Sequence, residues 1–528
     1  MTKIFIQRAL NILLLLIFAL YLSGGFTFRH KVFFEDLGSL MTPLIVFLCL
    51  IFWLRLDNDQ FILFRGFSQL EQSIRTKKGP RGLSSYLIIL AVVSSLGTFI
   101  MLPLVRHWSF ASWFWDLGVM EQVIWRKAFG YGLTSTAILN NPLLPLDFLK
   151  NQHLNFWLIP TAQLYSLIPR TELLLFLQSL AFILALIPLY KIGRILIPQQ
   201  QPFLLPLFYW CWEAIHRNNI WDIHESAYIP VLSFWAYYYF LKRKWLQTAF
   251  FTLAIALFKE DAWVLAGAMG FYFFSIEKRW FAAFSCLFLG AGVFVSYGVF
   301  FNKVNTLSDR YAFLGSNFGE TLPILKHDPL IFFRQLFHVG PLSFLLRLIM
   351  AGGGFWLFGG WAIIPMIPTF LECALSSNPG MYSFSNHYVI SLAGPLFIST
   401  AYGIKNLKES KRIKKYFKLI LLTGTFLIMS QLHFFEAARL QDYFRSTAWK
   451  QRRCLEELVN EIPPGEAVYA DDPLATHLSQ RELFMTYRVH EPVTLTDAWI
   501  ATVETTELPS DFRVVDRKCG CMIAHRPF

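Results

Sequence analysis

Two acidic residues in the first third of the chain have the chemistry of a catalytic pair. They are Asp116 and Glu121, in the segment Trp115 to Gln122. If this segment is helical, a spacing of five places both roughly on one side. Two carboxylates can share a metal ion, or one can act as a general base when its pKa is raised. We therefore predict both residues as catalytic, with solvated acids on a surface helix as the alternative.

A second polar group fills the short segment His216 to Glu225, between two apolar runs. It contains Arg217, Asp222, His224 and Glu225. A turn that only has to reach water does not need so many ionisable groups, so we expect either a site or a structural hydrogen-bond network. The segment is not a zinc-protease motif, because the residue four positions after His224 is a tyrosine.

Three more polar positions border apolar runs. Lys259, Glu260 and Asp261 stand together without the Gly, Pro, Asn or Ser typical of a loop. A cation beside two carboxylates suits an internal ion-pair network or a phosphate site. His153 precedes one apolar stretch and His387 begins another. The alternative for these histidines is a helix cap or a packing role.

The composition shows which kind of scaffold must hold these residues. Of the 528 residues, 55% are hydrophobic and 16% charged, against about 25% charged in soluble domains. Apolar runs long enough for spanning helices, which need about 20 residues, recur along the chain. The net charge of +12 lies mostly in short clusters between these runs. This placement follows the positive-inside rule and indicates a membrane protein without nucleic-acid partners.

Alternation of basic and acidic or histidine-bearing loops predicts about thirteen spans. The N-terminus is cytoplasmic, and the first large outer loop covers residues 106–170. We predict that the stretch 154–168 is a helix at the membrane surface. Counting it as a span would move Lys191 and Arg194 to the outside, against the charge pattern. Every polar group above then lies at the outer ends of helices.

Three parts follow along the chain. Residues 1–83 form two N-terminal spans and a basic cytoplasmic loop, and residues 84–435 form the transmembrane core. Residues 436–528 are charged, with an expected helix at 445–461, strands at 467–470 and 512–516, and a hairpin completed by 519–525. We therefore predict an all-α polytopic membrane protein with a small extracytoplasmic α/β domain at the C-terminus.

The ordered polar segments resemble a family of bacterial and archaeal polytopic membrane proteins known as a domain of unknown function. The matching segments are WDLGVMEQ, NQHLNFWLIP, WDIHESAYIP and FKEDA, followed by NHY and ATHLSQR. The similarity extends from about Trp113 into the tail. This chain has Glu121 where the family usually has aspartate, which keeps the carboxylate on a longer side chain.

That family resembles the GT-C glycosyltransferases, which include protein O-mannosyltransferases and the aminoarabinose transferase of lipid A. The resemblance implies a GT-C-like core and a polyprenyl-phosphate sugar as donor. It also implies a catalytic acid in the first large outer loop, which here is Asp116. The third predicted span then corresponds to the first helix of that core, and two extra helices precede it. The expected location is the bacterial inner membrane.

These features together predict a glycosyltransferase that inverts the sugar in one step. Asp116 acts as the base, assisted by Glu121, and the acceptor is an extracytoplasmic glycan, lipid or protein. The leaving phosphate is bound by four basic residues: His153, Arg217, His224 and Lys259. Five residues support them: Asp222, Glu225, Glu260, Asp261 and His387. The sequence assigns no definite cofactor and leaves a divalent cation, Mg²⁺ or Mn²⁺, open, with Asp116, Glu121, Asp222 and His224 as candidate ligands.

Two other classes of protein fit the same sequence. A transporter or flippase for a lipid-linked or anionic substrate would use the outer cavity without chemistry, although transporters usually place charges near the bilayer midplane. A non-catalytic envelope assembly protein would bind partners through the tail. It would tolerate loss of the outer carboxylates but not loss of the tail.

Overall fold

The computed structural model describes residues 26–28, 31–33, 83–137, 145–197, 202–300, 310–315, 318–413, 416–429, 440, 442–487 and 497–526. The two predicted N-terminal spans, the basic cytoplasmic loop and the end of the last predicted span lie outside these ranges. Two short strands precede the helical part, β1 (Phe26–Phe28) and β2 (Lys31–Phe33), and they pair antiparallel.

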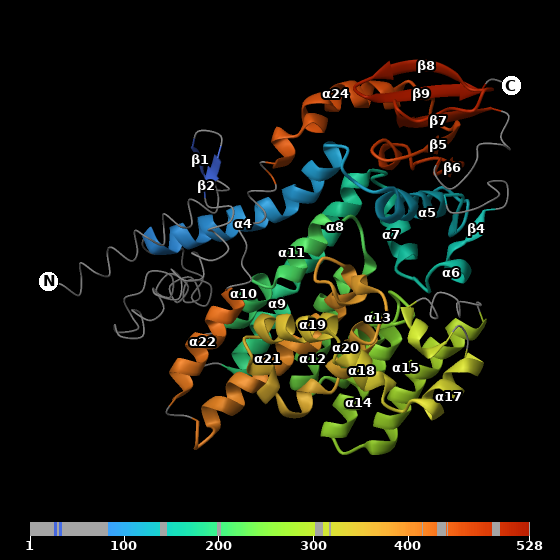
Figure 1. The fold of residues 1–528 in the computed structure, drawn as a ribbon. Helices are drawn as coiled ribbons and strands as arrows, with labels where there is room; N and C mark the ends of the chain where they lie inside the picture. Colours follow the sequence, from blue (N-terminus) through green and yellow to red (C-terminus); the bar gives the residue numbers. More distant parts are fainter. Residues whose placement is uncertain are drawn as a thin grey trace.

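Helices form most of the described chain before the tail (Figure 1). Their bounds are α4 (Leu83–Trp108), α5 (Val119–Ala128), α6 (Phe148–Asn151), α7 (Leu158–Tyr165), α8 (Thr171–Leu184), α9 (Leu186–Leu196), α10 (Leu204–Trp210), α11 (Glu213–Ile220), α12 (Ile229–Leu241), α13 (Trp245–Ile255), α14 (Ala262–Ile276), α15 (Trp280–Phe300), α17 (Phe318–His327), α18 (Ile331–Leu336), α19 (Val339–Ala351), α20 (Met366–Ala374), α21 (Ala393–Glu409) and α22 (Phe417–Met429). A two-stranded sheet, β3 (Thr134–Ser135) and β4 (Leu146–Asp147), lies in the first outer loop.

Among the described residues, one helical stretch is long and apolar enough to cross a membrane. It is Thr171–Leu196, formed by α8 and α9, with 26 residues and a mean hydropathy of 2.3. Shorter apolar helices follow at α13, α14, α15 and α19. The stretch predicted to lie at the membrane surface contains α7, whose 8 residues are too few to span a bilayer. The number of spans and their direction stay predictions.

The tail forms a five-stranded sheet with one helix. The strand order is β6 (Phe484–Met485), β5 (Ala467–Ala470), β7 (Ala498–Val503), β9 (Cys521–Arg526) and β8 (Arg513–Lys518). β5 pairs parallel with β6 and β7, whereas β9 pairs antiparallel with β7 and β8. The predicted strand at 467–470 and the C-terminal hairpin are confirmed, as is the helix before them, α24 (Thr447–Asn460).

A disulfide joins α24 to the turn between β8 and β9, through Cys454 and Cys519. Cys521, two residues after Cys519, is buried in β9 as a free thiol. The bridge closes the tail between two elements that are 65 residues apart in the sequence.

The tail packs directly on the first outer loop, above the helical body in Figure 1. Phe484 of β6 contacts Phe114 with ring centroids 5.2 Å apart. The His477 ring lies between Phe110 and His107, at centroid distances of 3.9 and 4.3 Å. One continuous apolar core therefore includes residues of α5, α7, α8, α24 and the sheet. The tail is part of the support for the outer loop.

Candidate functional site

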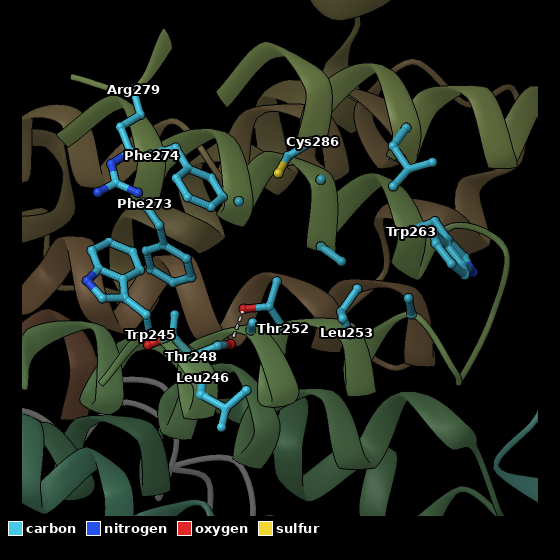
Figure 2. A pocket seen from close by; sticks show the side chains of 17 residues that line it. Trp245, Leu246, Thr248, Thr252, Leu253, Trp263, Phe273, Phe274, Arg279 and Cys286 are labelled. Atoms are coloured by element: carbon cyan, nitrogen blue, oxygen red, sulfur yellow. Dashed lines mark hydrogen bonds between the residues drawn. The ribbon is translucent and has the colours of Figure 1, made fainter. Parts of the chain in front are cut away.

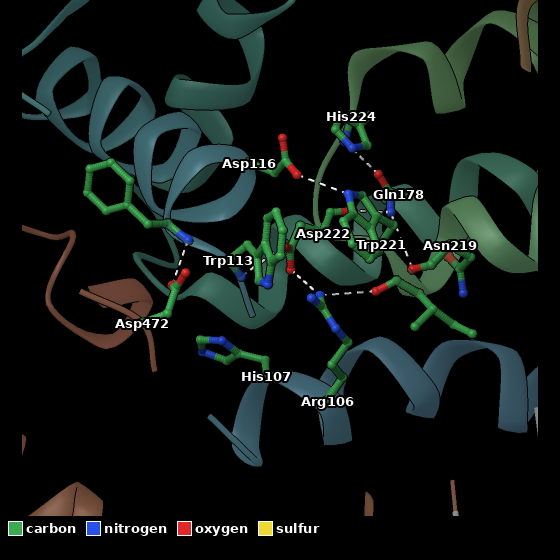
Figure 3. A network of polar contacts seen from close by, with 12 residues as sticks. Arg106, His107, Trp113, Asp116, Gln178, Asn219, Trp221, Asp222, His224 and Asp472 are labelled. Carbon is green, nitrogen blue, oxygen red and sulfur yellow. Dashed lines mark hydrogen bonds and ion pairs between the residues drawn. The ribbon is translucent and has the colours of Figure 1, made fainter. Parts of the chain in front are cut away.

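Asp116 lies on a π-helical turn, Phe114–Gly118, directly before α5. Such turns interrupt a regular helix and occur often at functional sites. One carboxylate oxygen of Asp116 accepts a hydrogen bond from the indole of Trp221 at 3.0 Å (Figure 3). Burial raises the pKa of Asp116, while Trp221 and Arg106 act in the opposite direction. Asp116 is partly exposed. Its carboxylate can therefore be reached by a substrate and can act as a base.

Asp222 binds the backbone at the start of this turn. Its carboxylate is fully buried, forms an ion pair with Arg106 and accepts the backbone N–H of Trp113 at 2.9 Å (Figure 3). Gln178 donates to the Asp222 carbonyl and accepts the N–H of His224 at 2.7 Å. For Asp222, the structure therefore shows the hydrogen-bond network that the sequence left as the alternative. Its role is to fix the position of the Asp116 turn.

Glu121 does not join Asp116, which corrects the expectation that both lie on one side. Its carboxylate has no exposed surface and is enclosed by four side chains that donate to it: Tyr165 (2.6 Å), Thr171 (2.8 Å), Ser479 (2.7 Å) and Gln480 (2.9 Å). A helix turns by about 100° per residue, so five steps rotate the side chain by about 140°. Glu121 connects α5 to α7, α8 and the tail.

Lys259 is the centre of a second cluster, between α13 and α14. It is 4% exposed, with its ammonium 3.9 Å from Asp261 and 5.0 Å from the centre of the Tyr388 ring. Burial lowers the pKa of Lys259, but the carboxylates of Asp261 and Glu225 outweigh burial and raise it. Lys259 therefore carries a positive charge in a buried site, where nearby carboxylates stabilise it.

His153 and Glu260 form a pair beside Lys259. The His153 Nδ1 lies 2.9 Å from one Glu260 oxygen, and the N–H of Leu154 donates to the other at 3.2 Å. Burial by itself raises the pKa of Glu260, but His153 and Lys259 lower it to about 2. Glu260 thus stays ionised and holds the loop before α7 against the Lys259 turn. It is a positioning residue in this arrangement.

His224 and His387 stack on each other, with ring centroids 4.1 Å apart. The Nε2 of His224 is buried and has no hydrogen-bond partner among the described residues. Burial lowers the pKa of His224 to about 4, and burial likewise lowers the pKa of His387. Both rings are therefore neutral near pH 7. Of the two ways in which His224 was expected to stabilise a phosphate, by charge or by hydrogen bonding, a neutral ring favours hydrogen bonding.

Arg310 is a member of this cluster that sequence reasoning missed. Its guanidinium lies 5.3 Å from the Tyr388 ring centre and 3.5 Å from the Tyr388 hydroxyl. Tyr388 therefore contacts both Arg310 and Lys259. The sequence signal that could have identified it is the pair Arg310-Tyr311, which follows the apolar run of α15. The predicted phosphate ligand Arg217 instead binds Glu213, one helical turn earlier, and lies 3.4 Å from the hydroxyl of Ser385.

A metal site does not form from the four predicted ligands. Glu121 is enclosed by its four donors, and Asp222 is paired with Arg106. Asp116 and His224 remain; Asp116 is bound by Trp221, and His224 lies three residues after that tryptophan. Within the described ranges, no three His, Cys, Asp or Glu side chains have an arrangement suited to a metal ion. These residues do not fit a resident Mg²⁺ or Mn²⁺.

Residues 106–504 match the family described as a predicted membrane protein (DUF2079). The chain belongs to this family. The resemblance noted in the sequence is thereby confirmed, and so is the assignment to predicted membrane proteins. No curated protein matches the chain.

Two solved structures share the fold of this family member. They are ArnT from Cupriavidus metallidurans bound to undecaprenyl phosphate, with a TM-score of 0.51, and the same protein in the apo state, with a TM-score of 0.52. Each is 12% identical to this chain, and the match covers 84% of this chain and 98% of ArnT. ArnT is a GT-C glycosyltransferase. The mostly helical body with its C-terminal sheet region therefore has a GT-C-like fold.

Proposed function

We propose that this family member is an inverting glycosyltransferase that uses a polyprenyl-phosphate sugar and an extracytoplasmic acceptor. One observation carries the proposal: the segment Trp221–Glu225 connects a carboxylate with a raised pKa to a pair of cations. At one end Trp221 binds Asp116. At the other end His224 stacks on His387, which adjoins Tyr388 and its two cations.

In the proposed reaction, Asp116 accepts the proton of an acceptor hydroxyl as its oxygen attacks the anomeric carbon. The bond between that carbon and the phosphate oxygen breaks, and the electron pair leaves with the polyprenyl phosphate. Lys259 and Arg310 stabilise the negative charge of the leaving phosphate. Neutral His224 offers its unpartnered Nε2 as a hydrogen-bonding group. No step requires a metal ion.

The disulfide supports an extracytoplasmic position of the tail, because such bonds persist in oxidising compartments. The fold shared with an undecaprenyl-phosphate-bound ArnT supports the lipid class of the donor. Both clusters lie at helix ends and in loops, which fits a reaction at the membrane surface better than a pathway through the midplane.

The test is complementation of a deletion strain with the wild type, Asp116→Asn or Glu456→Gln. Glu456 is an exposed acid on α24 and serves as the control. Mass spectrometry of envelope glycans should show a product that wild type and Glu456→Gln restore and Asp116→Asn does not, at equal membrane levels. Full restoration by Asp116→Asn contradicts the base assignment. Radiolabel that crosses the membrane without reaching an acceptor favours the transporter alternative.

The cation pair is tested separately with Lys259→Ala and Arg310→Ala. Both variants should raise the KM for the lipid-linked donor by about tenfold or more, since charge-assisted hydrogen bonds to phosphate contribute about 1.5 to 3 kcal/mol. The exposed cation Arg194 on α9 provides the control as Arg194→Ala. An unchanged donor KM in both variants removes these residues from the phosphate site.

A further inference from the structure

A groove lies between α13, α14 and α15, and its lining contains no residue of the two polar clusters. The volume of this groove is about 550 Å³ (Figure 2). Small residues form much of its wall: Ala249 and Thr252 on α13, Ala256 directly after it, and Ala266, Gly267 and Gly270 on α14. The two threonine hydroxyls in the wall, of Thr248 and Thr252, donate to the backbone of their own helix. The wall therefore presents an apolar surface.

The groove exists because α14 and α15 pack more closely than α13 packs on either. A Cβ atom on Gly267 would lie 2.6 Å from the carbonyl oxygen of Cys286 in α15, so glycine is required there. The small side chains of α13 leave the adjacent space open. Leu246, which lines the groove, is 82% exposed, and Leu253, also in its wall, is 58% exposed. In a membrane protein such surfaces face lipid, so the groove opens toward acyl chains.

One end of the groove is strongly basic. Arg279 and Trp245 line this end, and Trp263 lines the opposite end (Figure 2). The turns at this end also carry exposed Lys242, Lys244 and Lys278. Within the described part of the chain, no ion pair joins Arg279 or these three lysines to a carboxylate, whereas the neighbouring Arg243 is paired with Glu277. One cation, Arg279, therefore lines the end of an apolar groove, and three exposed lysines lie in the turns next to the lining residues Trp245 and Arg279.

We propose that this groove binds an anionic phospholipid of the leaflet opposite the candidate site. One acyl chain lies between α13 and α14, and the phosphate contacts Arg279 with Lys278. Basic pockets between membrane helices on the cytoplasmic side bind such headgroups, and the positive-inside rule assigns this end to the cytoplasm. Trp245 lies at the level where aromatic residues meet headgroups.

The position of the cations separates this lipid from the proposed sugar donor. Lys259 precedes α14, whereas Lys278 and Arg279 follow it. The 15 residues of α14 are about 22 Å long. A donor with its phosphate at Lys259 cannot also place that phosphate at Arg279. The phospholipid site does not require the transferase activity proposed above.

The experiment measures lipid retained by the purified full-length protein in native mass spectrometry, with dioleoyl phosphatidylglycerol or dioleoyl phosphatidylcholine added. Wild type should retain the anionic lipid preferentially. The double variant Lys278→Ala/Arg279→Ala should lose affinity by about fivefold for each cation removed. Arg194→Ala should bind like wild type. Ala249→Phe, which fills the groove from its lipid-facing side, should reduce binding of either lipid.

Three results overturn the proposal: equal retention of the two lipids by wild type, a double variant that matches Arg194→Ala, or displacement of phosphatidylglycerol from the groove by undecaprenyl phosphate. The first two remove the headgroup site, and the third makes the groove a donor site. If Ala249→Phe does not fold, the comparison of Lys278→Ala/Arg279→Ala with Arg194→Ala still tests the headgroup site.

Discussion

Asp116 and Glu121 come from one short sequence segment, yet the fold gives them opposite environments. Asp116 is partly exposed and accepts a hydrogen bond from the indole of Trp221. Glu121 has no exposed surface and receives hydrogen bonds from four side chains on α7, α8 and the tail. A carboxylate that must accept a proton needs space for its substrate, and only Asp116 has that space. Asp116 is therefore the candidate base, whereas Glu121 joins α5 to α7, α8 and the tail.

The largest expected effect comes from replacing each carboxylate by its amide. Asp116→Asn removes the base and should lower the turnover of glycosyl transfer by about 10²- to 10⁴-fold while thermal stability stays unchanged. Glu121→Gln should retain most activity. Sugar transfer and thermal unfolding of both purified variants provide the measurement. If the two variants lose the same activity, the assignment of separate roles is wrong.

Truncation of Glu121 should affect stability more than chemistry. Glu121→Ala leaves several buried donors without an acceptor, each at a cost of about 1 to 3 kcal/mol. The tail should then detach from the first outer loop more readily. Limited proteolysis near the loop that carries Ser479, together with the unfolding temperature, measures this effect. Unchanged proteolysis would show that other contacts hold the tail.

The charge of Glu121 should also give stability a distinct pH dependence. Burial raises its pKa, although Tyr165, Ser479, Gln480 and Thr171 lower it by hydrogen bonding. The folded protein therefore binds this proton more tightly than the unfolded chain does. Its contribution to stability is complete below the ordinary pKa of 4.5 and declines as pH rises toward the raised value. Unfolding of wild type and Glu121→Gln across this window should diverge as pH rises, with the glutamine variant the more stable.

The smallest expected effect concerns the hydrogen bond to Asp116. Trp221→Phe removes a donor that lowers the pKa of Asp116. The pKa should rise, and since the base must be deprotonated, the acidic limb of the kcat/KM profile should move to higher pH. A hydrogen bond to a charged group contributes about 1.5 to 3 kcal/mol, which corresponds to a shift of about one to two pH units. A limb that does not move indicates that another group limits the reaction at low pH.

Much of the scaffold could be predicted because its signals are local. The strand at 467–470 and the C-terminal hairpin follow from short runs between turns, and the short α7 follows from proline spacing and charge placement. Each of these features depends on neighbouring residues, so the sequence contains the information directly.

The composition of the site was less predictable. Asp116, Lys259, His224 and His387 do lie along one connected region, which their order in the chain could not establish. Arg310 was missed because a single arginine in a long loop gives no periodic signal, and its contact with Tyr388 spans 78 residues. Arg217 was overvalued because its partner Glu213 lies one turn earlier on the same helix.

By itself, the sequence determined a membrane protein with polar segments between its apolar runs, a separate charged tail and an ordered set of acidic, basic and histidine residues. Hydropathy, charge placement and turn residues act over a few positions, so these properties can be inferred without contacts. Only the tertiary structure decided which side chains stay accessible, which are neutralised and which are enclosed. Those outcomes depend on burial and on partners from distant segments. Two carboxylates five residues apart thereby acquire different environments.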